Sequence, residues 1–197
     1  MDDGPLIEMH ACIGRCLDRW SQVEFAVHLL FLSLNDRHIR ANDPLLASFE
    51  ANRSFNAKRQ TLRTYVMSDD RAEGLFRDRF GSLDPKLGVA HEQRNEIAHF
   101  KLVRHYDAKA ADGTIMLHQF GSFTGRFFHR DKTPLLTREV FARAESFAEL
   151  AKRCFRFVTY IRNVRGLLDE HETPFADPER LLDHPYSGPT QPIITIS

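Results

Sequence analysis

The residues most able to do chemistry in this chain lie in the hexapeptide Arg94-Asn95-Glu96-Ile97-Ala98-His99. Arg94 and His99 are five positions apart, near the end of a predicted helix that has an apolar face. An arginine can hold a phosphate through its planar fork of donors, and a histidine can transfer protons near neutral pH. Together these two groups supply most of what metal-free cleavage of RNA requires. The spacing is common in helices, so its significance depends on the elements that surround it.

Two charged residues occupy apolar helix faces in the sequence pattern. Glu24 falls in a face of the first predicted helix whose other members are Ile13, Leu17, Trp20, Val27, Phe31 and Leu34. Arg94 falls in a stripe of the motif helix whose other members are Leu87, Ala90, Ile97 and Ala98. Because a lone buried charge costs several kcal/mol, we predict a buried ion pair between Glu24 and Arg94, with Glu24 supporting the site. The alternative is that each side chain reaches solvent at the edge of the bundle.

For His99 the alternative is a surface or capping histidine, since a cation is favoured near a helix C-terminus. His91, Asn95 and His99 recur at intervals of four and therefore share one side of the predicted helix. The segment from His91 to Asn95 begins like the zinc-binding pattern HExxH but ends in Asn, so the second ligand is missing. We expect no metal site and no cofactor.

The hydrophobic period predicts a mostly helical chain around these residues. Helices are predicted over 6–35, from Asp43-Pro44, and over 54–67, 69–80, 85–100 and 137–171. A break is predicted at Gly81-Ser82-Leu83, with Asp84 as the N-cap and Pro85 as the first residue of the motif helix. The last helix carries an apolar stripe of Val140, Ala144, Phe147, Ala151, Cys154, Val158 and Ile161.

Between 101 and about 130 the period of the pattern changes to two. This predicts short strands at 102–106, 114–120 and 125–129, the first two joined by a turn at Ala111-Asp112-Gly113. The predicted fold class is therefore all-α, a helical bundle with a small β-hairpin or meander inserted at about 101–130. We expect one helical domain over 1–171 and a Pro-rich C-terminal tail over 172–197.

Composition narrows the partners that the chain can take. The charges of its 27 basic and 27 acidic residues cancel to a formal net charge of zero. RNA binding would therefore have to come from a local basic cluster. Such a cluster is present on the last predicted helix, at Arg138, Arg143, Lys152, Arg153, Arg156, Arg162 and Arg165. It is either a solvated face or a surface that follows phosphates. The three cysteines, Cys12, Cys16 and Cys154, fit reduced thiols, and no stretch has transmembrane length, so we expect a cytoplasmic protein without membrane contact.

The hexapeptide, the Trp- and Glu-bearing first helix and the long last helix together resemble the HEPN superfamily. The hallmark of that family is Arg, a polar residue that is often Asn, about three further residues and then His. The resemblance covers roughly residues 6–170, with the hexapeptide as its specific signature. It implies that Arg94 and His99 are catalytic and that Asn95 orients them. The hairpin at 101–130 departs from the minimal family pattern.

The resemblance implies that the protein is a metal-independent endoribonuclease that acts in a toxin–antitoxin or defence system. The cleavage would proceed by attack of the ribose 2′-OH and leave a cyclic phosphate. The partners implied are RNA, a second copy of the chain in a homodimer, and a cognate antitoxin or a nucleotidyltransferase-type protein. The alternative is a catalytically inactive HEPN-like module that dimerises and binds a nucleotide or RNA.

Overall fold

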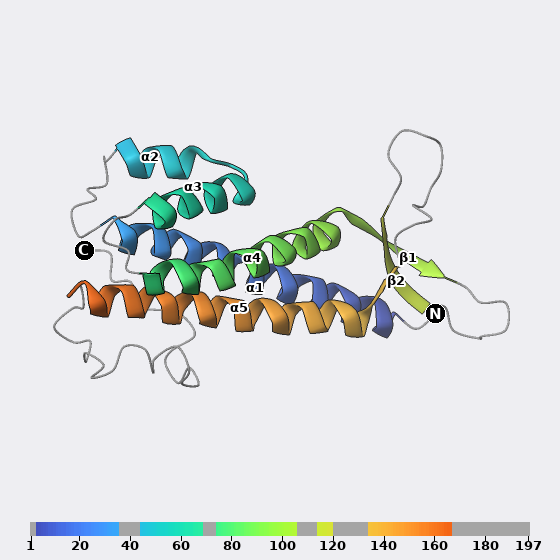
Figure 1. The fold of residues 1–197 in the computed structure, drawn as a ribbon. Helices are drawn as coiled ribbons and strands as arrows, with labels where there is room; N and C mark the ends of the chain where they lie inside the picture. Colours follow the sequence, from blue (N-terminus) through green and yellow to red (C-terminus); the bar gives the residue numbers. More distant parts are fainter. Residues whose placement is uncertain (1–2, 36–43, 69–73, 106–113, 120–133, 167–197) are drawn as a thin grey trace, which may run out of the picture. The chain divides into compact units, whose positions relative to one another are not determined.

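The structure is a computed structural model of the 197-residue chain, and it describes residues 3–35, 44–68, 74–105, 114–119 and 134–166. Within these ranges the chain is mostly helical and carries a small three-stranded antiparallel sheet. The helices are α1 (Gly4–Leu34), α2 (Pro44–Ala51), α3 (Phe55–Ser68), α4 (Gly74–His99) and α5 (Thr137–Val164), and the strands are β1 (Phe100–His105), β2 (Thr114–Gln119) and β3 (Leu135–Leu136) (Figure 1). The predicted mainly helical fold is therefore confirmed.

The chain divides into two compact units. The first unit combines Met1–Ser21 with Val89–Ala148, and the second combines Gln22–Gly88 with Glu149–Ser197. The predicted extent of the helical domain, 1–171, stays a prediction, and the predicted tail at 172–197 lies outside the described residues. No helix in the described ranges is both long enough and apolar enough to cross a membrane.

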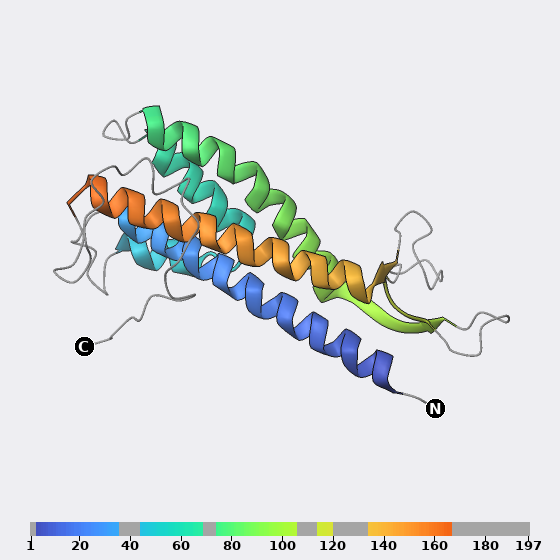
Figure 2. The ribbon, with the colours of Figure 1, turned by 90° about the horizontal axis from the view of Figure 1, so that it is seen from below.

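In the first unit, parts of α1, α4 and α5 lie side by side (Figures 1 and 2), and Trp20 of α1 contacts rings on both other helices. The Trp20 ring is 2% exposed, and its centroid lies 5.5 Å from that of Phe147 on α5, in an edge-to-face arrangement. Such aromatic contacts add to the free energy gained from apolar burial. This ring contact joins the first helix to the last within the unit that also contains the hexapeptide.

Helix α1 buries a slightly different face from the predicted one. The buried apolar side chains are Met9, Cys16, Trp20, Val23, Ala26, Val27, Leu30, Phe31 and Leu34, whereas Leu17 is 37% exposed. The helix ends where Asn35 bonds back to the carbonyl oxygen of Phe31 through its side-chain Nδ2, at 2.8 Å. The buried lane therefore passes through position 23 and leaves position 24 to solvent.

Helix α4 runs without interruption from Gly74 to His99, so the predicted break at 81–83 is wrong. Pro85 lies inside this helix, where it removes one hydrogen-bond donor. Asp84 was expected to cap a new helix, but its carboxylate lies 3.2 Å from Arg59 Nε and 3.8 Å from an Arg63 nitrogen in the second unit. A local capping signal was overridden by a tertiary ion pair.

Helix α5 shows the predicted apolar stripe in full, since every one of its seven members is buried. Its first turn is held by the Glu139 side chain, which accepts a hydrogen bond of 2.7 Å from the Leu136 backbone N–H, as in a capping box. The helix ends at Val164, earlier than predicted. Gly166 stops it by adopting a φ of 63°, a left-handed conformation that favours glycine.

The β-hairpin follows α4 directly. Strands β1 and β2 pair antiparallel from Phe100 opposite Gln119 to His105 opposite Thr114, and this confirms the predicted first two strands. Ile115 and Leu117 point into the unit, and Leu117 pairs with Leu135 of β3. Strand β3 was not predicted; the predicted strand at 125–129 and the turn at 111–113 lie outside the described residues.

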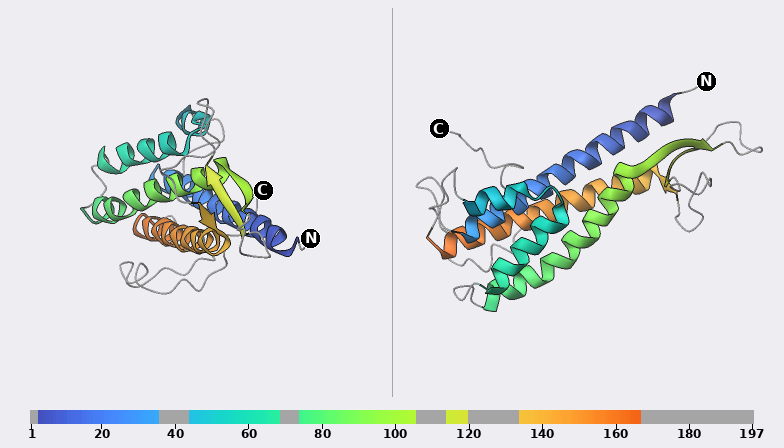
Figure 3. Two further views of the ribbon diagram at one scale, coloured as in Figure 1. Left: turned by 90° about the vertical axis from the view of Figure 1, so that its right-hand side faces the viewer. Right: turned by 90° about the horizontal axis from the view of Figure 1, so that it is seen from above.

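In the second unit, α2 and α3 lie beside the C-terminal part of α1 (Figure 3). The rings of Phe31 on α1 and Phe49 on α2 stack at 4.0 Å with an interplanar angle of 8°, and Tyr65 on α3 meets Phe31 edge-on at 5.6 Å. Ser54 precedes α3, and its Oγ accepts a long hydrogen bond from the Ala57 N–H. These contacts position the short helices against one aromatic cluster.

Candidate functional site

The predicted site residues lie on the last two turns of α4, in the first unit. Arg94 and Asn95 are half-buried, His99 is the last residue of the helix and is exposed, and β1 begins at the next position. The helical rise of about 1.5 Å per residue puts His99 roughly 7.5 Å along the axis from Arg94. The structure therefore brings Arg94 and Asn95 together directly and places His99 at the end of the same helix.

Arg94, Asn95 and His91 form a chain of hydrogen bonds along one side of α4. Arg94 Nη1 donates to Asn95 Oδ1 at 3.2 Å, and Asn95 Nδ2 lies 3.1 Å from His91 Nε2. Since the amide nitrogen of Asn95 can only donate, His91 Nε2 is the acceptor in this hydrogen bond. Asn95 thus hydrogen-bonds both the guanidinium of Arg94 and the histidine one turn earlier.

His91 is a residue that the sequence did not assign to the site. Its ring centroid lies 6.0 Å from that of Trp20, at an interplanar angle of 34°, so the imidazole is supported by the buried core of the unit. The available signal was the spacing of four between His91 and Asn95, which places both side chains on one helix face. His91 is linked to Arg94 through Asn95.

Arg94 retains hydrogen-bonding capacity that no group in the described ranges uses. Its Nε is buried and has no hydrogen-bond partner among the described residues. A buried donor without an acceptor costs about 1–3 kcal/mol, which an anionic ligand accepting from the guanidinium would offset. His99 likewise makes no hydrogen bond or ion pair with any residue in the described ranges. Among the described residues, neither the Nε of Arg94 nor the imidazole of His99 is therefore engaged in a hydrogen bond.

An ion pair holds the centre of the hexapeptide, but it is between residues that were not predicted to pair. Arg143 Nη2 on α5 lies 2.8 Å from Glu96 Oε2 on α4, and Arg143 Nη1 donates a 3.1 Å hydrogen bond to the Gln93 carbonyl oxygen. The two side chains are only 18% and 24% exposed. Arg143 thus anchors α4 to α5, and this use removes it from a surface that could follow phosphates.

The predicted burial of Glu24 is wrong. Glu24 is exposed, because the buried lane of α1 passes through its neighbours Val23 and Val27 instead. Without a buried carboxylate, the physical reason for a pair with Arg94 disappears. Glu24 belongs to the second unit and Arg94 to the first, so their pairing stays a prediction.

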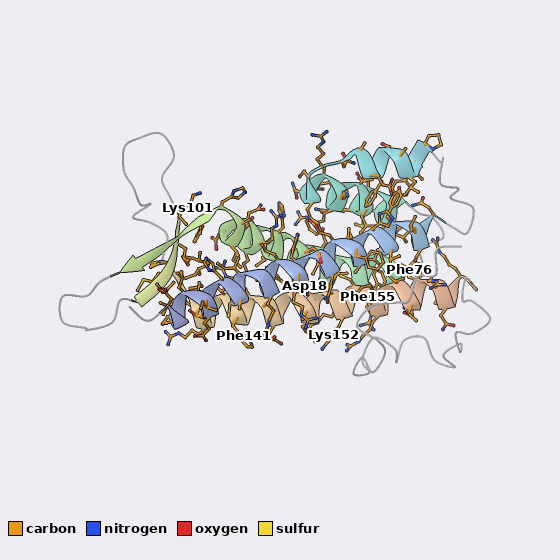
Figure 4. All side chains as sticks on the ribbon, turned by 180° about the vertical axis from the view of Figure 1, so that it is seen from behind. Asp18, Phe76, Lys101, Phe141, Lys152 and Phe155 are labelled. Carbon is orange, nitrogen blue, oxygen red and sulfur yellow. The ribbon has the colours of Figure 1, made fainter. Side chains whose placement is uncertain are left out.

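Other cations of the predicted basic cluster, on α5 and directly after it, also make contacts with described residues. Arg165 donates to the carbonyl oxygens of Ser33, at 3.3 Å, and of Leu34, at the end of α1. Arg153 Nε lies 3.4 Å from Glu149 Oε1, one turn away on the same helix. Lys152, which is labelled in Figure 4, directly precedes Arg153 on α5. Arg143, Arg153 and Arg165 of the predicted basic cluster are therefore engaged in contacts with other described residues.

The two buried cysteines, Cys16 and Cys154, are unsuited to nucleophilic chemistry. Burial raises the pKa of the Cys16 thiol to about 11, although nearby Arg143 lowers it, and burial raises the pKa of Cys154 to about 12. Both thiols are therefore protonated at neutral pH. Only the deprotonated thiolate form of cysteine acts as a nucleophile or as a metal ligand. No group of three or more His, Cys, Asp or Glu side chains in the described ranges is arranged to hold a metal ion.

The comparisons with known proteins add no relative to this picture. The chain matches no protein-family model, no curated protein and no solved structure.

Proposed function

We propose that this protein is a metal-independent endoribonuclease of the HEPN type, with Arg94 and His99 as catalytic residues and Asn95 as the residue that orients Arg94. The observation that carries the proposal is the state of Arg94. Its Nη1 is directed by Asn95, while its Nε has no partner among the described residues. A guanidinium that is held at one end and unsatisfied at the other is suited to bind a phosphate.

The chemistry assigned to these residues is in-line transesterification. The ribose 2′-oxygen attacks the adjacent phosphorus and loses its proton to an imidazole, whose ordinary pKa of about 6.5 suits proton exchange near neutral pH. Arg94 stabilises the negative charge that develops on the phosphorane oxygens. The 5′-oxygen leaves and takes up a proton, so the products are a 2′,3′-cyclic phosphate and a 5′-hydroxyl.

The reaction needs one group to remove a proton and another to supply one. A homodimer in which two copies of the hexapeptide face each other would provide both from His99 and its equivalent in the second copy. We therefore propose a homodimer acting on RNA in the cytoplasm, within a toxin–antitoxin or defence system that includes an antitoxin or a nucleotidyltransferase-type partner. Sedimentation of the full chain at micromolar concentration should give a dimer; a strict monomer would count against the shared site.

The decisive experiment is cleavage of a labelled RNA by the full chain in the presence of EDTA. We expect cleavage that ends in a 2′,3′-cyclic phosphate and that is lost in His99→Ala and in Arg94→Ala. An RNA with a 2′-O-methyl group at the cleaved position should resist, because its 2′-oxygen has no proton to lose. His10→Ala and Arg138→Ala are matched controls, since both residues are exposed in the same unit and outside the hexapeptide. Cleavage that persists in both site variants would refute the assignment.

A second candidate function is a catalytically inactive HEPN-like module that dimerises and binds RNA or a nucleotide. The observation that favours it is the position of His99, an exposed helix-terminal side chain that no described residue hydrogen-bonds or orients. Preorganised groups are what make an active site efficient. Binding of RNA that weakens in Arg94→Ala, without any cleavage by the wild-type chain, would support this candidate over the nuclease.

A further inference from the structure

The second unit contains a cleft whose walls are strongly basic. The cleft has a volume of about 380 Å³ and is lined by Arg79 and Lys86 of α4 and by Arg153 and Arg156 of α5. Glu149 is the one carboxylate among its lining residues. Because the whole chain has equal numbers of basic and acidic residues, four cations around one cleft reflect local placement and not general composition.

Most of this positive charge has no ion-pair partner among the described residues. The described residues provide an ion pair only for Arg153, whose Nε lies 3.4 Å from Glu149 Oε1. Arg79, Lys86 and Arg156 have no such partner in the described ranges. The Nε of Arg156 is moreover buried without a hydrogen-bond acceptor. Like-charged side chains repel one another, so an arrangement of this kind is stabilised when a polyanion occupies the cleft.

We propose that this cleft binds the di- or triphosphate group of a small phosphorylated ligand. Arginine side chains bind phosphate oxygens through two parallel N–H donors, and a lysine adds a mobile point charge. A volume of about 380 Å³ lies at the lower end of the range that holds small ligands. Because the cationic side chains come from both α4 and α5, they can contact two or three linked phosphate groups at once, and a single phosphate group would leave some of them without a partner.

A small polyphosphate fits the observations better than a nucleic-acid chain. A strand of RNA needs a continuous row of cations along its backbone. Arg165, directly after α5, is however used in hydrogen bonds to backbone carbonyl oxygens. Phe157, which also lines the cleft, is only 2% exposed and offers no open ring face for base stacking. The recognised part of the ligand is therefore the phosphate group.

Calorimetric titration of the full chain with pyrophosphate, ATP and AMP tests the proposal. We expect pyrophosphate and ATP to bind, and AMP to bind much more weakly. ATP binding far tighter than pyrophosphate binding would show that a nucleoside contributes, whereas equal affinities would identify a free polyphosphate site. No binding of either polyphosphate at millimolar concentration would overturn the proposal. Binding of a short RNA alone, lost in the variants below, would also overturn it.

Variants localise the site. Lys86→Gln and Arg156→Gln should each weaken pyrophosphate binding by about tenfold, the effect expected for one charged hydrogen bond. Lys86 is exposed, so its substitution leaves the core intact. Lys152→Gln is the matched control, because it removes the same charge from α5 at a position that does not line the cleft. Glu149→Gln should tighten binding, since it removes the opposing carboxylate and releases Arg153. Equal weakening by Lys152→Gln, or no tightening by Glu149→Gln, would refute a specific site.

Discussion

Glu96 Oε2 lies 2.8 Å from Arg143 Nη2, and this ion pair fastens the middle of the hexapeptide to α5. Glu96 follows Asn95 directly, so the pair fixes the helix segment from which Arg94 and Asn95 project. Arg143 Nη1 also donates a hydrogen bond of 3.1 Å to the carbonyl oxygen of Gln93, in the same part of α4. The positions between the two conspicuous residues of the motif are thus used to hold it in place.

The first prediction concerns the stability supplied by this pair. Glu96→Ala leaves a mostly buried guanidinium without its carboxylate and should lower the free energy of unfolding by about 2–3 kcal/mol. Urea denaturation measures the change. Arg153→Ala is the matched control, because its pair with Glu149 is half-exposed, at 48% and 47%, and should cost less than about 0.5 kcal/mol. Equal costs for the two variants would show that the burial of the Glu96–Arg143 pair has no energetic consequence.

The second prediction concerns His91 and rests on the proposed ribonuclease activity. His91 hydrogen-bonds with Asn95, and the proposed mechanism gives it no contact with the RNA, so His91→Ala should lower kcat by about tenfold through loss of one oriented hydrogen bond. His91→Gln, which retains a polar partner for Asn95, should recover part of this loss. The pH dependence of kcat/KM should be unchanged in His91→Gln, since the proton is exchanged at His99. A shifted pH profile would make His91 itself the proton-transfer group.

The third prediction concerns Gly88 in α4. A Cβ built there would lie 3.2 Å from Arg59 Cζ and closer still to its Nη1, and Arg59 is held by its ion pair with Asp84. Alanine inside a helix normally gains about 0.5–1 kcal/mol over glycine, but displacing a mostly buried ion pair costs more. Gly88→Ala should therefore destabilise the protein by about 1–2 kcal/mol in urea denaturation. Gly81→Ala, in the same helix with nothing within 4 Å of its Cβ, should stabilise it instead.

The fourth prediction concerns pH. Burial lowers the pKa of His28 below its ordinary value, against the opposite effect of Glu50 at 3.9 Å and with a further lowering by Lys58. Between the folded-state pKa and about 6.5, the unfolded chain binds more protons than the folded chain, so stability falls as the pH falls through that interval. His28→Asn should reduce this loss of stability between about pH 7 and pH 5. An NMR titration that gave His28 a pKa above 6.5 would instead show that the attraction of Glu50 dominates.

The fifth prediction uses the raised pKa values of two thiols. Cys16 and Cys154 are fully buried, with pKa values of about 11 and about 12, whereas Cys12 is part-exposed. Iodoacetamide acts on the thiolate, so the folded protein should be alkylated at Cys12 alone near neutral pH, and at all three cysteines in urea. Mass spectrometry of the peptides identifies the modified positions. Modification of Cys154 at the rate of Cys12 would show that the core of the second unit opens readily.

Local patterns in the sequence were sufficient for most of the secondary structure. The stripe on α5 is buried at every predicted position because spacings of three and four keep side chains on one helix face. The hairpin of β1 and β2 was predicted because a period of two places alternate side chains on one face of a strand. These features depend on neighbours within a few positions, which a single sequence displays directly.

Errors arose where a local signal competed with a distant partner. Asp84-Pro85 has the composition of a helix start, but Arg59 takes the Asp84 carboxylate and α4 continues through Pro85. Glu24 lies one position from the buried lane of α1, and a shift of about 100° around the helix separates a core residue from a solvent-exposed one. At the edges of an apolar face, the periodicity of the sequence does not locate the boundary to within one residue.

For the candidate site, the sequence by itself determined which groups are present: a guanidinium, an amide and an imidazole on the last two turns of one helix. Only the tertiary structure decided how they are held. Trp20 supports His91, His91 holds Asn95, and Arg143 joins Glu96 across to α5. The physical reason is that helical spacing determines which side chains share a face, whereas burial and pairing depend on which residues of other helices reach that face in the folded chain.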